Sequence, residues 1–171
     1  MMTMIPAWEN GELKPVDKLE VHRRGLRHPA VSVFVMNGMR TLLQRRALIK
    51  YHTPGLWANA CCTHPYWGEA AADCATRRLQ QELGLAQVEV ESFGELEYRA
   101  EVGQSLIEHE CVHIFVARGD WLPNPNPDEV MATRWVTLDG LREEIGQSPH
   151  RFTPWLRIYM EQYAEAIFSQ R

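Results

Sequence analysis

The sequence predicts a single α/β (α+β) domain in which helices sandwich a mixed β-sheet. The chain has 171 residues, a length that suits one domain with a substantial core. Hydrophobic residues make up 45% and charged residues 23% of the chain, near the globular average, so we expect a folded chain. Strand-like runs alternate with a few helical patterns, and no linker divides them. We therefore expect one domain over residues 1–171, with an N-terminal arm at about 1–20 and a C-terminal helix at 151–171.

The first expected elements are strands. Asn37-Gly38 is a favoured tight-turn pair, and it lies between the strand-like runs "SVFVMN" and "MRTLLQRRA". This arrangement predicts a β-hairpin. The stretch "LWANACC" is typical of a further short strand. Later strands are expected at residues 88–93, 95–99, 110–117 and 133–136, with a proline-rich loop, "WLPNPNPDE", before the last of them.

Three segments have helical patterns. Residues 69–83 place an apolar stripe on one face, and Gly84 is a favourable C-terminal stop. Asp139 is positioned to cap a short helix that runs to Ile145. Thr153 and Pro154 suit the N-cap and the first position of the final helix.

Net charge, apolar runs and cysteine spacing indicate which binding partners and which cellular compartment to expect. The net charge of −4 argues against general nucleic-acid binding. The longest apolar run, residues 31–36, is too short to cross a bilayer, and the N-terminus lacks the order of a secretory signal. The four cysteines have no regular disulfide spacing, which favours reduced thiols. We expect a cytoplasmic protein, monomeric or homodimeric, with no nucleic-acid or membrane partner.

Residues 63–85 resemble the Nudix signature, G-x5-E-x7-R-E-U-x-E-E-x-G-U, where U is aliphatic. A Nudix hydrolase needs several carboxylates on one helix to hold metals that activate water. Arg78 replaces one of those glutamates, and it is suited to hold a diphosphate intact. It is equally suited to pair with Glu82, one turn away on an exposed helix face. The chain keeps the signature at Glu69, Arg77, Leu79, Glu82, Gly84 and Leu85, and departs from it at Thr63, Arg78 and Gln81.

A longer series of fragments follows the chain in the order "RRALIK", "PGLWANACCTHP", "RRLQQELG", "YRA", "EHE" and "FTPW". In their order, and over about residues 16–155, the chain resembles type 1 isopentenyl diphosphate isomerases, a Nudix-fold family. The resemblance implies that isopentenyl diphosphate and dimethylallyl diphosphate are interconverted through a tertiary carbocation, in isoprenoid biosynthesis. A Nudix-type diphosphate hydrolase is the alternative. A structural zinc site is disfavoured, because only one Cys-x-His pair exists.

The resemblance implies four catalytic side chains. Cys62 would be one acid/base and Glu110 the opposing carboxyl group, with Tyr98 hydrogen-bonded to Glu110. Trp155 would face the carbocation, where cation–π attraction reaches about 2 kcal/mol. Outside the family context, Cys62 suits a small buried hydrophobe, and Tyr98 and Trp155 suit packing roles. The adjacent Cys61 points to the opposite strand face, and we expect it to pack.

The resemblance also implies two metal sites. Glu108 and Glu110 alternate along a strand and so face one side, and imidazole with carboxylate suits Mn²⁺, Zn²⁺ or Mg²⁺. His22 and His28 are slightly closer together in this sequence than the corresponding histidines of the family. His22 is therefore the least secure of the implied metal ligands. We expect the remaining histidines to be structural or solvent-facing. The implied ligands of the first ion are His22, His28, His64, Glu108 and Glu110; the other histidines are His52, His109, His113 and His150.

A second ion, Mg²⁺, would bridge Glu82, the backbone carbonyl of Cys62 and the substrate diphosphate. Four basic residues would neutralise the rest of the diphosphate charge, the arginines bidentately and the lysines as point charges. For the two lysines, an ordinary solvated role is equally consistent with the sequence. The four residues are Lys18, Arg46, Lys50 and Arg78.

Overall fold

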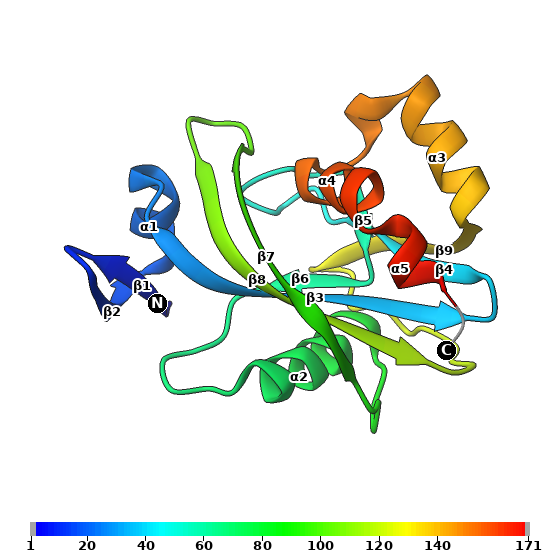
Figure 1. Ribbon diagram of the computed structural model, residues 1–171, viewed down its shortest axis with the longest axis horizontal. Helices are drawn as coiled ribbons and strands as arrows, with labels where there is room; N and C mark the ends of the chain where they lie inside the picture. Colours follow the sequence, from blue (N-terminus) through cyan, green and yellow to red (C-terminus); the bar gives the residue numbers. More distant parts are fainter. Residues whose placement is uncertain (1–2, 170–171) are drawn as a thin grey trace.

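A seven-stranded mixed sheet forms the centre of the computed structural model, which describes residues 3–169 (Figure 1). Strands β3 (Arg27–Asn37) and β8 (Ile107–Arg118) pair in parallel, and β7 (Glu91–Glu101) runs antiparallel to β8. Parallel and antiparallel neighbours therefore coexist, which confirms the expected mixed sheet.

Strands β4 (Arg40–Arg46), β5 (Trp57–Asn59) and β9 (Val130–Thr137) form the other half of the sheet, which is joined to β3 only at one end of β4. Strand β4 pairs with β3 only beside the turn, where Met36 and Asn37 face Thr41 and Arg40. Farther along, β4 pairs with β5 and β9, whereas β6 (Cys61–Thr63) takes the edge of β3. The chain segments after β4 and around β6 can therefore converge beside the central strands.

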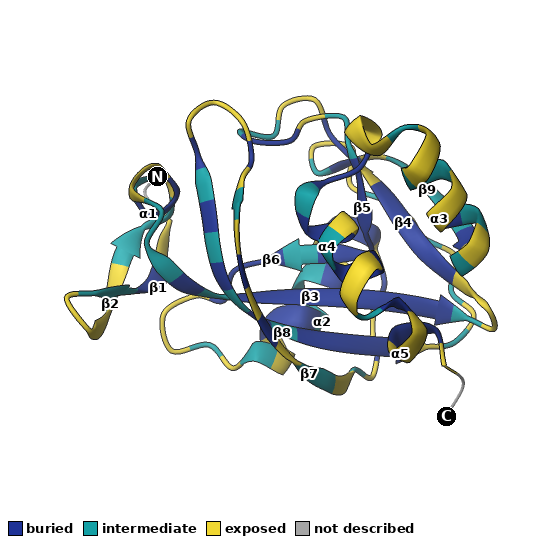
Figure 2. Ribbon diagram, turned by 45° about the horizontal axis from the view of Figure 1, so that its top comes forward, coloured by how far each residue is buried: buried dark blue, intermediate teal, exposed yellow. Residues whose placement is uncertain are grey.

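Helices cover both faces of the sheet, as expected. Helix α2 (Ala71–Leu83) lies on one face, and α3 (Leu138–Gln147), α4 (Pro154–Gln162) and α5 (Ala164–Phe168) lie on the other (Figure 1). Along β3 the side chains alternate between two hydrophobic clusters, so β3 is buried over most of its length (Figure 2). Within the described residues, no helix combines the length and apolar character that spanning a membrane requires.

The expected N-terminal arm is a folded unit. Strands β1 (Met4–Glu9) and β2 (Glu12–Asp17) form a hairpin that leads into helix α1 (Lys18–Arg24). The Asp17 side chain accepts hydrogen bonds from the first-turn amides of α1. A small core of Ile5, Ala7 and Val21 joins the hairpin to the helix. This unit fixes the position of α1 beside the central strands.

The turns and helix ends follow the sequence closely in two places. The Asn37-Gly38 hairpin is confirmed, with Gly38 at a φ of 56°. Helix α2 ends at Gly84 in the left-handed conformation, also as expected. It begins at Ala71 rather than Glu69, because the Glu69 carboxylate is held by Arg77 and by the Tyr66 amide.

Three expectations about individual elements need correction. The strand at "LWANACC" is interrupted at Ala60 and forms β5 and β6. The strands expected at 88–93 and 95–99 are one strand, β7, with an irregularity between Ser92 and Gly94. Helix α3 is capped by the Thr137 hydroxyl, which accepts from the Gly140 amide, and not by Asp139.

The C-terminal helix expected at 151–171 is also wrong as a continuous element. A short 3-10 helix, η1, spans Pro149–Arg151 and precedes α4, which begins at Pro154 as the sequence predicts. Tyr163 leaves the helical conformation, with a φ of −131°, and separates α4 from α5. Residues 170–171 of the expected helix lie outside the described residues.

Candidate active site

One pocket collects side chains from the N-terminal helix, the opened sheet and α4. The segment that joins β4 to β5 contributes three consecutive lining residues, so this loop forms one wall. The lining residues are Lys18, Arg46, Lys50, Tyr51, His52, Cys62, Thr63, His64, Arg78, Glu108, Glu110 and Trp155. All four of the basic residues expected to bind diphosphate are among them.

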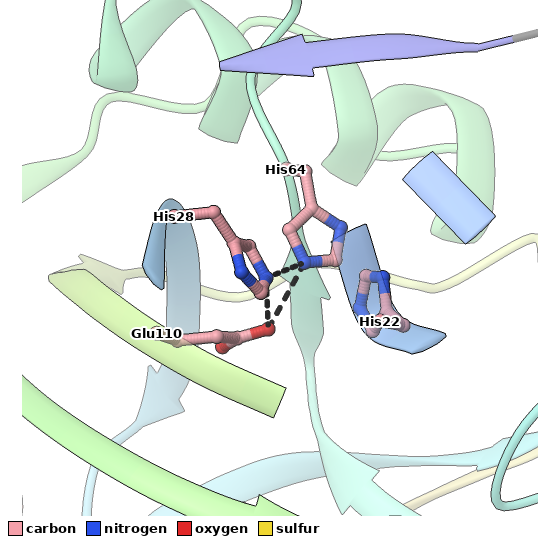
Figure 3. A group of neighbouring side chains, drawn as sticks. All are labelled: His22, His28, His64 and Glu110. Atoms are coloured by element: carbon pink, nitrogen blue, oxygen red, sulfur yellow. Dashed lines mark hydrogen bonds and ion pairs between the residues drawn. The ribbon is translucent and has the colours of Figure 1, made fainter. Parts of the chain in front are cut away.

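A cluster of buried imidazoles meets a carboxylate at this pocket (Figure 3). His64 Nε2 lies 3.0 Å from Glu110 Oε1, and His28 Nε2 lies 3.2 Å from His64 Nε2 and 3.6 Å from Glu110 Oε1. His22 reaches the same cluster from α1, and its side chain is fully buried. One potential ligand atom from each of the four lies within 4.8 Å of the others. His22 therefore lies not on the surface but within the buried cluster, where it could share a metal ion with the other three residues.

The hydrogen bonds of two of these histidines fix their tautomers. His22 Nδ1 and His28 Nδ1 each lie 2.7 Å from a backbone carbonyl, of Lys18 and Leu26 respectively. A carbonyl only accepts, so each Nδ1 carries a proton, which leaves Nε2 as the ligand atom when the ring is neutral. His22 Nε2 is buried without a hydrogen-bond partner in the described part of the chain. These nitrogens fit a divalent metal ion, which would satisfy all of them at once.

Burial favours the neutral form of His22 and His64. It lowers the pKa of His22 to about 4, with the neighbouring His28 adding to the effect. Burial, followed by the charge of Lys18, holds the pKa of His64 well below its ordinary value. A neutral imidazole is the form that binds metal. The electrostatics therefore agree with the geometry.

The two glutamates of β8 form a coupled pair. Tyr98 Oη lies 2.8 Å from a carboxyl oxygen of Glu108 and 2.8 Å from one of Glu110. Burial, then repulsion from Glu110, raises the pKa of Glu108 well above its usual range. Burial opposes ionisation of Glu110 as well, but the adjacent imidazoles of His28 and His64 outweigh it and hold that pKa low. The pKa values of the two carboxyl groups are thus shifted in opposite directions, and Glu110 is the more readily ionised of the pair.

Cys62 faces the pocket, whereas Cys61 faces the other way. Ser32 Oγ donates a hydrogen bond to Cys62 Sγ at 3.2 Å, and it lies 2.9 Å from Tyr159 Oη. Burial, followed by the charges of Glu110 and Glu108, raises the pKa of the Cys62 thiol well above its ordinary value. Cys62 is therefore a protonated thiol. Cys61 is fully buried with its sulfur 3.8 Å from Glu82, as the alternation of the strand predicts.

Two of the four cations of the pocket, Arg78 and Lys50, have acidic partners in the protein. Arg78 Nη2 lies 2.5 Å from Glu82 Oε1 and 3.3 Å from Glu129 Oε1, and Lys50 also pairs with Glu129. The Arg78 and Glu82 side chains are 17% and 5% exposed, so their pairing is not that of an exposed helix face. Burial, then Lys50 and Arg78, lowers the pKa of Lys18 to about 8. Both lysines thus belong to the pocket rather than to the open surface.

The remaining predicted residues take different positions around the pocket. Trp155 is 1% exposed, and its ring lies 5.3 Å from the Arg46 guanidinium carbon. Glu82 is 4% exposed and occupied by bonds from Arg78, Gln44 and Cys61, next to the pocket wall. Tyr98 lies behind the two glutamates.

Sequence reasoning did not single out several residues in and around the pocket, of which His52 is the clearest case. We expected it to be structural or solvent-facing, yet it is 4% exposed and its Nε2 lies 3.5 Å from Glu108 Oε1. It lies in a loop, where no periodicity reports the direction of a side chain. Ser32 gave a usable signal, since it is a polar residue within the apolar run "AVSVFV". Tyr159 follows Trp155 by one helical turn, which also places it toward this face.

Comparison with known proteins gives the family. The profile described as NUDIX domain matches residues 26–156. An isopentenyl-diphosphate Delta-isomerase of Rhodobacter capsulatus is 59% identical over 167 residues, which cover 96% of this chain and 95% of that protein. The chain belongs to the isopentenyl-diphosphate Delta-isomerase family. An isopentenyl-diphosphate Delta-isomerase of Cereibacter sphaeroides (strain KD131 / KCTC 12085) is also 59% identical, over 172 residues that cover 99% of this chain and 97% of the relative.

Solved structures place this isomerase-family chain on the Nudix fold. Protein DR0079 of Deinococcus radiodurans superposes with a TM-score of 0.74 at 14% identity, covering 93% of this chain and 97% of that one. The MutT protein of Methanosarcina mazei Go1 gives a TM-score of 0.66 at 15% identity, covering 82% and 94%. At such identities the likeness concerns the fold alone. The expected fold class and family resemblance are both confirmed.

Proposed function

We propose that this chain interconverts isopentenyl diphosphate and dimethylallyl diphosphate. The observation that carries the proposal is the meeting of the Cys62 thiol and the Glu110 carboxyl group in one pocket lined by four basic side chains. The thiol and the carboxylate suit proton transfer, and the cations suit a diphosphate. Membership of the isomerase family supports the same reaction.

The reaction adds one proton and removes another. Protonation of the terminal CH₂ of isopentenyl diphosphate leaves a tertiary carbocation at the carbon that bears the methyl group. Loss of a proton from the adjacent CH₂ then forms the allylic double bond. In this proposal Cys62 and Glu110 are the two proton-transfer groups, one on each side of the five-carbon unit, and their roles exchange in the reverse direction.

Neighbouring side chains orient the two proton-transfer groups. Ser32 donates to the Cys62 sulfur, and Tyr98 donates toward Glu110. The buried indole of Trp155 offers a π-face to the carbocation, worth about 2 kcal/mol when the cation is desolvated. Its burial also keeps water from the cation, which would otherwise be trapped as an alcohol.

The diphosphate would lie among Lys18, Arg46, Lys50 and Arg78. Arg78 and Lys50 would exchange part of their contact with Glu129 for phosphate oxygens. Hydrolysis of the diphosphate is the weaker alternative. Helix α2 carries Arg78 and Gln81 where the Nudix signature has metal-binding glutamates, so its carboxylate cluster is incomplete.

We assign a first divalent ion, Mn²⁺, Zn²⁺ or Mg²⁺, to the buried histidines and glutamates. When bound, such an ion supplies positive charge that fixes the ionised form and orientation of the carboxyl groups. A second ion, Mg²⁺, is assigned to Glu82, the Cys62 carbonyl and the diphosphate. The proposed ligands of the first ion are His22, His28, His64, Glu108 and Glu110. A cytoplasmic location, a monomeric or homodimeric state and the absence of nucleic-acid and membrane partners stay predictions.

One assay separates isomerase from hydrolase. The purified protein is incubated with isopentenyl diphosphate and Mg²⁺, and dimethylallyl diphosphate and free phosphate are both measured. We expect allylic product at a rate proportional to enzyme, without phosphate release. Phosphate release without allylic product would establish the hydrolase instead.

A further inference from the structure

His52 occupies a position that the proposed ligand set leaves unexplained. It lies in the loop 47–56 between β4 and β5, yet its side chain is buried against the metal cluster. Its ring stacks on that of His22, with the centroids 5.7 Å apart and the planes at 24°, and its edge meets the Trp155 ring at 5.9 Å. A loop imidazole has thus been placed between the metal cluster and the reaction pocket.

The donor atoms around His52 form a second possible metal group. Potential ligand atoms of His22, His52 and Glu108 lie within 4.8 Å of one another. This group shares His22 with the first group of His22, His28, His64 and Glu110. Two imidazole nitrogens and a carboxyl oxygen form the donor set that divalent transition metals prefer.

The neighbouring backbone holds His52 in this position at a conformational cost. Thr53 adopts a φ of 46°, in the left-handed region that β-branched residues rarely enter. Its Oγ1 lies 3.1 Å from His52 Nδ1, and Arg46 Nη2 donates to the His52 carbonyl at 3.2 Å. The His52 Nδ1 contact leaves Nε2 directed at Glu108. Local strain that aims a buried imidazole at a carboxyl group indicates a function for that side chain.

We propose that His52 is an additional ligand of the divalent ion held by the histidine–glutamate cluster. This inference rests on the proposed metal centre. Because the same loop carries Lys50 and Tyr51 into the pocket, ligation by His52 would fasten that wall. Metal occupancy and the placement of Lys50 for the diphosphate would then be coupled.

Cobalt tests the ligand role without any measurement of turnover. The protein is stripped of metal by dialysis against a chelator and titrated with Co²⁺, whose visible absorption reports its ligands. For His52→Ala we expect at least about tenfold weaker Co²⁺ binding and a shifted absorption band. Added imidazole should restore the wild-type band by filling the vacated position. His52→Gln, which retains most of the side-chain volume, is the second variant in case the alanine variant folds poorly.

Matched variants make each outcome decisive. His150→Ala removes an exposed histidine and should bind Co²⁺ like the wild type. His64→Ala removes a proposed ligand and should lose Co²⁺. Failure of the wild type itself to bind Co²⁺ would overturn the metal centre as a whole. Normal affinity and band position in His52→Ala and His52→Gln would overturn only the role of His52, as would weaker binding with an unchanged band.

The loop provides an independent measurement. Amide hydrogen exchange over residues 47–56 should slow when Co²⁺ binds the wild type, because ligation by His52 would restrain the loop. In His52→Ala the same amides should exchange at one rate with and without Co²⁺. Equal slowing in both proteins would contradict the proposed fastening.

Discussion

The two halves of the pocket differ in how fully the protein satisfies their charges. The cation half consists of Lys18, Arg46, Lys50 and Arg78, and within it Arg78 and Lys50 already have carboxylate partners in Glu82 and Glu129. The metal half consists of His22, His28, His64, Glu108 and Glu110. There the Nε2 atoms of His28 and His64 face each other at 3.2 Å, and His22 Nε2 has no hydrogen-bond partner among residues 3–169.

This difference indicates what each half does when ligands bind. The cation half can exchange internal carboxylates for phosphate oxygens, so its ligand can enter and leave in each cycle. The metal half is incomplete without a cation, so we expect its ion to be resident. Changes to the metal half should therefore affect metal content and turnover together. Changes to the cation half should affect mainly the affinity for diphosphate.

The largest effect is expected for Glu110→Gln. The substitution removes a proton-transfer carboxylate and a proposed metal ligand at once, so we expect kcat to fall by about 10⁴-fold and metal content after dialysis to fall with it. Steady-state kinetics and metal analysis measure the two losses. Glu97→Gln, at an exposed carboxylate on β7, is the matched control. Full metal content and activity in Glu110→Gln would contradict the assignment of Glu110 to the metal half of the pocket.

Cys62→Ala should separate chemistry from metal binding. We expect kcat to fall by about 10²- to 10³-fold, since proton transfer is lost, while the metal content stays at the wild-type level. Cys111→Ala is the control, because Cys111 bonds to Glu97 on the outer side of β8. Wild-type turnover in Cys62→Ala would remove the thiol from the mechanism.

Arg78→Gln should affect the cation half alone. The loss of charge-assisted hydrogen bonds to the diphosphate, each worth about 1.5–3 kcal/mol, should raise KM roughly 10- to 100-fold. Metal bound by the metal half should be retained, which metal analysis after dialysis can check. Arg45→Gln, at an exposed neighbour of Arg46 that donates to the Gly55 carbonyl, is the control. An unchanged KM in Arg78→Gln would show that Arg78 serves only to pair with Glu82.

The smallest effect is a pH dependence of diphosphate affinity. The pKa of Lys18 is lowered to about 8, so the free protein carries this charge below pH 8 and loses it above. Above that pH a proton must be taken up on binding, so KM should rise by up to about tenfold per pH unit. Lys18→Arg should abolish the rise. A wild-type KM that is flat between pH 7 and 9 would contradict the assignment of Lys18 to the diphosphate.

The regular elements could be predicted from the sequence because local backbone preferences determine them. The Asn37-Gly38 turn, the Gly84 stop and the opposite directions of Cys61 and Cys62 follow from backbone preference and strand alternation. The interruption at Ala60 could not be predicted from the sequence, because it arises from the pairing of β5 and β6 with different strands. The break at Tyr163 carries no proline or glycine signal.

The missed site residues depend on contacts between distant segments. Glu129 lies in a proline-rich loop that the sequence places at the surface, and its pairing with Lys50 spans 79 residues. His52 is directed inward by the unusual conformation of Thr53, which no residue pattern reports. The predicted ligands and cations came from the family resemblance. The roles of these residues stay predictions, although the structure brings most of them to one pocket.

Proton transfer with an intact diphosphate is the central claim, and turnover in D₂O tests it most directly. The proton delivered to the terminal carbon comes from a side chain that exchanges with solvent. Dimethylallyl diphosphate formed from isopentenyl diphosphate in D₂O should therefore carry deuterium in a methyl group, as NMR can detect, and no free phosphate should accompany it. Allylic product without deuterium, or phosphate in place of the allylic product, would contradict the account.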